Sequence, residues 1–192
     1  MTGIRLISLI VAILCAAAPA RAEGLEDSPI IAGAPQSCKD FRGFIVRTTH
    51  MPDLGDVARA MIISRMPIIA IDQNRMVELP DKFQLFFYLH ECGHHRLGHT
   101  VAPTMGSENE ADCWAIKQAR ERKLFSRDDV AAFAPLFAKS RGSRAGHLPG
   151  PQRAARLLTC FDDPGDSIED LDPAAGTTMQ SASTSIVEPG NQ

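Results

Sequence analysis

The stretch YLHECGHHRLGHT, Tyr88–Thr100, holds four of the six histidines in this chain of 192 residues. It contains the motif H-E-x-x-H, in which His90 and His94 lie one turn apart if the segment is a helix. Both imidazoles can then point at a single metal ion. Glu91, next to His90, is placed to take a proton from a water molecule at that ion. Because neutral imidazoles bind zinc and a carboxylate relays protons, the motif indicates a catalytic zinc site.

The residues around the motif predict the helix that it needs. Pro80 and Asp81 are suited to begin a helix, phenylalanines between 83 and 87 continue it, and Gly98 is suited to end it. The motif also arises by chance on exposed polar helices. The assignment therefore depends on whether the rest of the chain supplies the ligand that is still missing.

A catalytic zinc ion needs a third protein ligand, and three candidates compete for this role. His95 projects about a quarter turn away from the face that carries His90 and His94. His99 follows the predicted end of the helix, and its spacing does not fit the longer motif H-E-x-x-H-x-x-G-x-x-H. A downstream carboxylate in SENEADCWA, residues 107–115, is the better candidate.

This acidic segment predicts a second helix. Ser107 and Glu110 have the spacing of a capping box, so the helix is expected from about Glu108 to Lys123. Glu108 and Asp112 are one turn apart, so Glu108 can bind the ion while Asp112 orients a ligand histidine. A solvated acidic helix start would account for Glu110, and for Glu108, but less well for Asp112 among apolar neighbours.

Further patterns predict an α+β fold that is mostly helical, with a small sheet. FRGFIVRT, residues 41–48, and PIIAID, residues 67–72, predict strands. Residues 54–62 carry apolar side chains at helical spacing behind Asp53, a good N-cap, and therefore predict an amphipathic helix.

Two more helices are predicted toward the C-terminus. Ser126 and Asp129 open one of them, which Pro135 must kink or shorten. Gly150 and Pro151 begin the last one. Its apolar side would carry Ala154, Leu157, Leu158 and Phe161.

The two ends of the chain differ from its centre, residues 23–161, which is expected to form one folded domain. Residues 1–22 have a basic start, a short apolar run and an Ala-x-Ala site, which predicts a signal peptide and export to the periplasm or the exterior. The run is short for a membrane span, and retention as an uncleaved anchor is the alternative. Residues 162–192 are acidic, lack Lys and Arg, and are predicted to be disordered. The formal charge of −3 argues against a nucleic-acid partner.

Removal of the signal peptide would leave Cys38, Cys92, Cys113 and Cys160. Four cysteines in an oxidising compartment predict two disulfides, and three pairings are possible. We expect a bridge between Cys92 and Cys113, which would join the two ligand-bearing segments, and a second bridge that closes the ends. Spacing alone does not decide among the three pairings.

HECGHHRLGH followed by ENEAD resembles the gluzincin zinc metallopeptidases, and most closely the CaaX-protease and heat-shock-protease family, over roughly residues 67–158. The resemblance implies a zincin-like core with one zinc ion per chain. It implies His90, His94 and Glu108 as ligands, Glu91 as general base and Asp112 behind the ligands. Family members usually carry transmembrane helices, so this chain is expected to be an exported, stand-alone catalytic core. Cytoplasmic peptidases that cleave antitoxins share a similar pattern and are the other possible relatives.

The same family carries a His-Pro stretch with an arginine six residues after the histidine. GHLPGPQR provides His147 and Arg153 at that spacing, with Leu148 inserted before the proline. The resemblance implies that both side chains face the zinc and stabilise the oxyanion of the tetrahedral intermediate. The alternative is that Arg153 is an ordinary solvated helix residue. Gluzincins hold the substrate as an added strand at a sheet edge, which would place the cleft beside PIIAID.

The leading hypothesis is a zinc-dependent peptidase that hydrolyses bonds in a peptide or protein substrate, with Glu91 as the base. The alternative is an exported binding module on the same fold, with or without zinc, that does not cleave its partner. A secreted structural domain held by disulfides would leave the histidine cluster unexplained.

Overall fold

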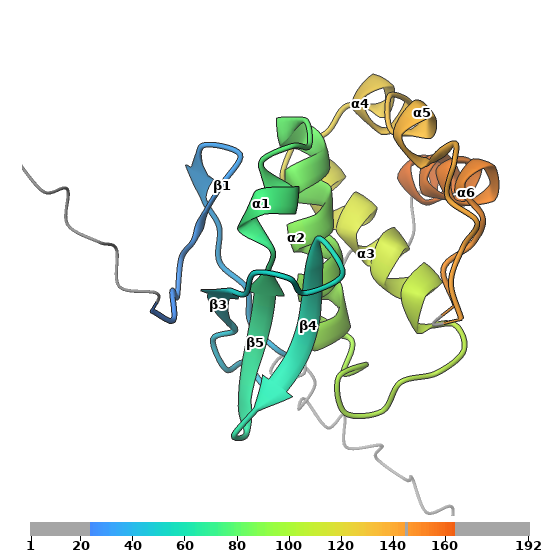
Figure 1. The fold of residues 1–192 in the computed structure, drawn as a ribbon. Helices are drawn as coiled ribbons and strands as arrows, with labels where there is room; N and C mark the ends of the chain where they lie inside the picture. The colour runs from blue at the N-terminus through green and yellow to red at the C-terminus, as the bar shows by residue number, and fades with distance from the viewer. Residues whose placement is uncertain (1–23, 145, 164–192) are drawn as a thin grey trace, which may run out of the picture.

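A computed structural model describes residues 24–144 and 146–163, in which a small sheet packs against helices (Figure 1). The strands are β1 Ile30–Ile31, β2 Ala34–Pro35, β3 Arg47–His50, β4 Ala58–Ile63 and β5 Met66–Ile71. The helices are α1 Gln73–Met76, α2 Asp81–Arg96, α3 Ser107–Glu121, α4 Arg127–Ala131, α5 Ala134–Phe137 and α6 Gly150–Asp162. This is the predicted α+β class. The predicted signal peptide lies outside the described residues, as does the predicted tail from residue 164 onward. The first two residues of that predicted tail are structured instead: Asp162 is the last residue of α6, and Asp163 caps it.

The main sheet has the order β3-β5-β4, with β5 parallel to β3 and antiparallel to β4. The prediction that PIIAID forms a strand is confirmed, because β5 contains most of it. Its predicted place at the sheet edge is wrong, because β5 is the central strand. An apolar run that is buried along its length fits a central strand, and all of Pro67–Ile71 is buried.

The edge strand beside the helices is β4, and it occupies the segment predicted to be an amphipathic helix. Ser64 and Arg65 both have positive φ, of 49° and 68°, which is the backbone of a tight two-residue hairpin turn. The turn pairs Ile63 with Met66 and continues to Ala58 opposite Ile71. Apolar spacing in so short a segment fits a helix or a strand, and the pairing with β5 decides.

The strand predicted over residues 41–48 begins later than expected. Only Arg47–His50 forms β3, while Gly43, with a φ of 87°, turns the chain within the preceding loop. An isolated bridge between Lys39 and Ile45 closes this loop.

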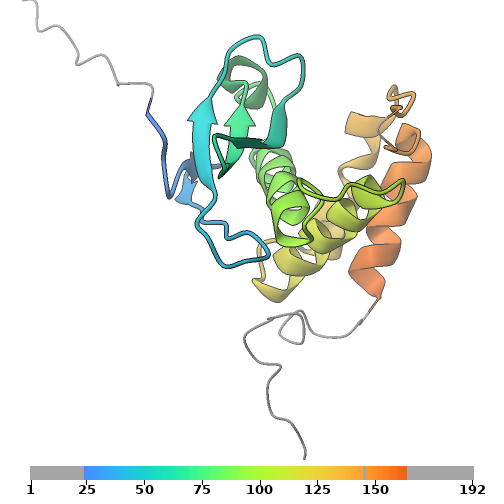
Figure 2. The same ribbon diagram turned by 90° about the horizontal axis from the view of Figure 1, so that it is seen from below.

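Helices α2 to α6 lie where the sequence predicts helices, whereas α1 was not predicted. Ser126 and Asp129 form the predicted capping box. The helix that they begin is interrupted between α4 and α5, just before Pro135. The prediction of an N-cap at Ser107 is wrong: Ser107 is the first residue of α3, and its Oγ accepts a hydrogen bond from the backbone N of Thr104 at 2.8 Å. α2 lies between the sheet on one side and α3 and α6 on the other (Figure 2). None of the helices within the described residues is long and apolar enough to cross a membrane.

Two disulfides, Cys38–Cys92 and Cys113–Cys160, fasten the two long central helices. The predicted number of bridges is confirmed, and the predicted pairing is wrong. Although α2 and α3 pack together, Cys92 faces the segment before β3 and Cys113 faces α6. The bridges therefore tie each helix to an outer element instead of tying the two helices to each other, and they indicate an oxidising environment.

Candidate metal centre

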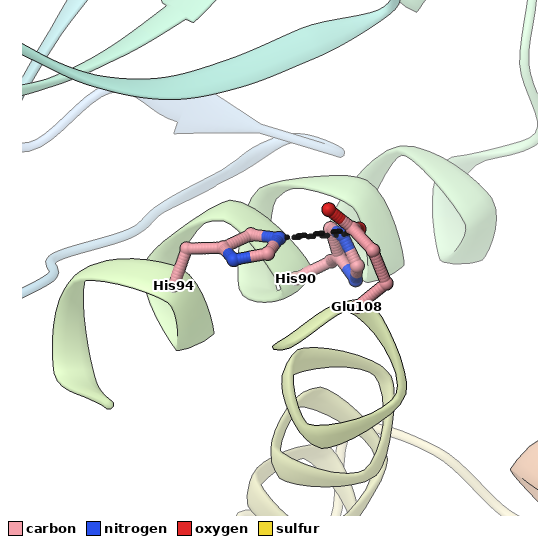
Figure 3. A group of neighbouring side chains, drawn as sticks. All are labelled: His90, His94 and Glu108. Atoms are coloured by element: carbon pink, nitrogen blue, oxygen red, sulfur yellow. Dashed lines mark hydrogen bonds and ion pairs between the residues drawn. The ribbon is translucent and has the colours of Figure 1, made fainter. Parts of the chain in front are cut away.

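Three possible ligand atoms converge where α2 meets α3 (Figure 3). The Nε2 atoms of His90 and His94 are 3.1 Å apart, and Oε2 of Glu108 lies 3.2 Å from the first and 3.4 Å from the second. Ligands about 2.0–2.1 Å from a tetrahedral zinc ion lie about 3.3 Å from one another. The donors thus have the type and the spacing that such an ion requires.

Gly93 explains how α3 comes close enough to α2 to deliver Glu108. A Cβ atom at Gly93 would lie 3.2 Å from the backbone oxygen of Ala111 and 3.2 Å from the ring of Trp114. A larger residue would push the helices apart. The glycine in HECGH is therefore a packing residue that positions the third ligand.

His90 is held from behind by a buried ion pair. Its Nδ1 lies 2.8 Å from Oδ1 of Asp112, and Asp112 in turn accepts hydrogen bonds from Nε and Nη2 of Arg153 at 2.8 and 2.7 Å. Because this contact holds the Nδ1 side of the ring, Nε2 faces Glu108, where it could bind a metal ion once its proton has been displaced. Asp112 thus has the predicted orienting position.

His94 is held by a different chain of contacts, which the sequence analysis missed. Its Nδ1 lies 3.2 Å from Nδ1 of His99, and Nε2 of His99 lies 2.9 Å from Oε2 of Glu110. These distances fit a relay in which His94 donates to His99 and His99 donates to Glu110. The relay leaves the Nε2 lone pair of His94 free for a metal. Gly98, with a φ of 79°, makes the turn that returns His99 to the cluster.

The adjacent His95 has no part in the cluster. Its Nε2 lies 2.9 Å from the carbonyl oxygen of Ile68, so this side chain binds α2 to β5. Burial lowers the pKa of His95, which favours the neutral ring. The adjacent residues His94 and His95 thus lie on different faces of α2, as the periodicity of a helix requires.

Glu91 lies between the ligand histidines and β4. Only 8% of the residue is exposed, and Oε2 accepts a hydrogen bond from the backbone N of Ala60 at 2.6 Å. This contact directs the carboxylate into a cavity of about 450 Å³ that borders the cluster. The cavity is lined by β4 residues 58–60, by the cluster and by the loop that precedes α3.

His147 reaches the cluster, whereas Arg153 stands behind it. Nε2 of His147 lies 2.8 Å from Oε2 of Glu108, and the His147 ring stacks at 5.6 Å from the ring of His90. Arg153 is buried in its pair with Asp112 and is not among the residues that line the 450 Å³ cavity. The expectation that Arg153 faces the metal does not match this geometry, nor does the alternative of a solvated residue.

The charges of the cluster favour a cation at its centre. Burial lowers the pKa of His90, but hydrogen bonds with Asp112 and Glu108 raise it, and the net pKa is about 10. Burial raises the pKa of Glu108, but hydrogen bonds with three histidines hold it well below its usual range. Burial likewise raises the pKa of Asp112, whereas His90 and Arg153 lower it, to about 2. Two ionised carboxylates therefore surround His90, and either a proton or a metal ion can balance them.

No family model, no curated protein and no solved structure matches this chain.

Proposed function

We propose that this chain is a zinc-dependent peptidase with a zincin-like core. The proposal is carried by one observation: three metal-ligand atoms at tetrahedral spacing share a cavity with a separate carboxylate, Glu91, and with the edge strand β4. A site that only stores a metal has no need of the separate carboxylate or of the open strand edge. The residues that would hold the ion are His90, His94 and Glu108.

A bound zinc ion would polarise the scissile carbonyl and make water a better nucleophile. Glu91 would accept a proton from the attacking water as the water oxygen bonds to the carbonyl carbon. The C–N bond then breaks, and Glu91 passes the proton to the leaving amine. His147, beside Glu108 at the cavity wall, would donate a hydrogen bond to the developing oxyanion.

The free edge of β4 is where we expect the substrate backbone to bind. The N–H of Ala60 points away from β5, because it donates to Glu91. Residues two apart in a strand point their backbone groups the same way, so Ala58 and Ile62 share this edge. A peptide added there as a further strand would pass next to Glu91. This assigns to β4 the role that the sequence suggested for PIIAID.

The test compares wild-type protein with Glu91→Gln after metal analysis of both. Each should hold one zinc ion per chain, because Glu91 is not a ligand. Cleavage of a broad peptide library should fall by about two to four orders of magnitude in Glu91→Gln, which is the usual contribution of a positioned acid–base group. Glu78→Gln, which changes an exposed glutamate before α2, is the matched control and should keep full activity.

Two results would contradict the proposal. If zinc-loaded wild type cleaves no peptide in the library, the binding module becomes the better interpretation. If cleavage is sensitive to a chelator but survives Glu91→Gln, another group activates the water.

A further inference from the structure

A second cavity, of about 530 Å³, lies between α2, α3 and the segment that precedes β3. It has no lining residue in common with the metal cavity. Cys38 and Cys92 form part of its wall, so it borders the disulfide that ties α2 to the segment before β3. Nothing in the proposed peptidase reaction uses this cavity.

The wall of this cavity is basic. Lys39 from the segment before β3, Arg96 at the end of α2 and Arg122 just after α3 line it, and among the described residues no Asp or Glu does. Within the described residues, the Arg122 side chain donates a hydrogen bond only to the neutral amide of Gln36, at 3.2 Å. Among residues 24–144 and 146–163, the side chains of Lys39 and Arg96 have neither a hydrogen bond nor an ion pair. Three cations without a carboxylate around one concave surface attract an anionic ligand.

Trp114 gives the same cavity an apolar surface beside the three cations. It lines the cavity, and only 8% of the residue is exposed. A ligand that carries anionic oxygens and some apolar surface would therefore suit both the cations and the indole ring.

The chain itself contains such a ligand. DSIEDLD, residues 166–172, has four acidic side chains and two aliphatic ones, and residues 164–192 contain no Lys or Arg. We propose that residues 166–172 dock in the basic cavity formed by Lys39, Arg96, Arg122 and Trp114. The docked segment would cover the Cys38–Cys92 disulfide and the outer face of α2.

The position of Asp163, the last described residue, means that the acidic segment has only a short distance to span to the cavity. Asp163 is anchored to α3, because its side chain accepts a hydrogen bond from Lys117 at 2.8 Å and its carbonyl accepts one from Arg120 at 2.7 Å. α3 also carries Trp114 and Gln118, which line the cavity, and Arg122 directly follows its last residue. Three to nine further residues span at most about 10–30 Å, and a helix with its side chains is about 10–12 Å across. The acidic segment can therefore pass around α3 to the cavity.

The single tryptophan of the chain provides the measurement. The full-length protein is compared with a full-length variant carrying Asp166→Asn, Glu169→Gln, Asp170→Asn and Asp172→Asn. The quenching of Trp114 fluorescence by acrylamide is measured in dilute buffer. The quenching constant should be about twofold or more lower in wild type, because the sum of several weak ion pairs keeps the segment docked in most molecules. Addition of 0.5 M NaCl should remove the difference, since salt screens exposed charges.

Two further variants make the result specific. Glu188→Gln, which neutralises an acid outside residues 166–172, should behave as wild type. Arg96→Gln combined with Arg122→Gln should raise quenching as much as the tail variant does, and the two sets combined should have no added effect. Equal quenching in wild type and the tail variant at low salt would overturn the proposal. Protection that grows with protein concentration would overturn it too, because the occupant would then be the tail of a second molecule.

Discussion

The two ligand histidines of the candidate metal centre are oriented by opposite physical means. Behind His90 stands the pair of Asp112 and Arg153, whose side chains are 1% and 7% exposed. Behind His94 stands the relay of His99 and Glu110, which runs from a buried ring to a carboxylate that is 58% exposed. Both arrangements free the Nε2 lone pair of a histidine. They differ in how much of the fold depends on them.

The buried side joins the metal centre to the core. The guanidinium of Arg153 lies 4.7 Å from the ring centre of Phe137 and 5.6 Å from that of Phe86, within the aromatic cluster of α2 and α5. A buried charge needs its partner, so a change at Asp112 affects folding and metal binding together. The exposed end of the relay, Glu110, carries little burial, so a change at that residue should affect the metal alone.

The largest effect is expected from Asp112→Ala. It leaves Arg153 buried and unpaired, which should lower the free energy of unfolding of the metal-free protein by about 3–5 kcal/mol. Zinc affinity should also fall by about ten- to a hundredfold. Denaturant unfolding and competition with a chelating dye measure the two effects. The double variant Asp112→Ala/Arg153→Met should recover much of the stability but not the zinc affinity. If Asp112→Ala alone is as stable as wild type, the fold does not depend more on the contacts behind His90 than on those behind His94.

The number of protons released on zinc binding should give the next largest difference between the contacts behind His90 and those behind His94. With its pKa raised to about 10, His90 of the metal-free protein holds both ring protons at pH 8, and zinc must displace one of them. Calorimetry in buffers of different ionisation enthalpy should therefore report about one proton released per zinc. Asp112→Asn should reduce this number, whereas Glu110→Gln should leave it unchanged.

The same raised pKa has a definite sign for stability. A folded-state pKa of His90 above its unfolded value of about 6.5 stabilises the metal-free protein below pH 6.5. That contribution is lost as the pH rises through 10. The free energy of unfolding of the metal-free protein should decline between about pH 6 and pH 10, the range over which the pKa of His90 is raised. A free energy that does not change over this range would contradict the assignment to His90.

A smaller effect is expected from His99→Ala. The substitution removes the acceptor for Nδ1 of His94, so zinc affinity should fall by about tenfold, the lower end of the range for residues behind a ligand. The free energy of unfolding should fall less than in Asp112→Ala, because the His99 ring is buried but no buried charge loses its partner. His95→Gln is the matched control on the same helix, and it should keep zinc affinity, because that side chain contacts Ile68 instead. Equal affinity losses in both variants would mean that helix damage, and not the relay, is responsible.

The smallest effect belongs to Glu110→Gln. Because the carboxylate is mostly in water, its loss should weaken zinc binding less than His99→Ala does, by about threefold or less, as expected for an exposed charged contact. Zinc titration of both variants in one buffer ranks them. A loss as large as that of Asp112→Ala would show that exposure does not decide the strength of these contacts.

Particular residues show where prediction from sequence succeeded and where it could not. α2, α3 and α6 were predicted within a few residues because apolar periodicity and proline positions act locally. β4 was predicted as a helix because its short apolar pattern fits both structures, and only its partner strand decides between them. The relay behind His94 was missed because His99 was weighed only as a ligand, although the turn at Gly98 was the signal that it could return to the cluster.

By itself the sequence determined which side chains could bind a metal together. His90 and His94 are four residues apart, as are Glu108 and Asp112, and a helix places such pairs on one face whatever surrounds it. Only the tertiary structure decided that Glu108 meets the histidines, that Arg153 is paired with Asp112, and which cysteines are joined. These contacts depend on how closely α2 approaches α3 and where α6 crosses them, and packing between remote segments leaves no periodic trace in the chain.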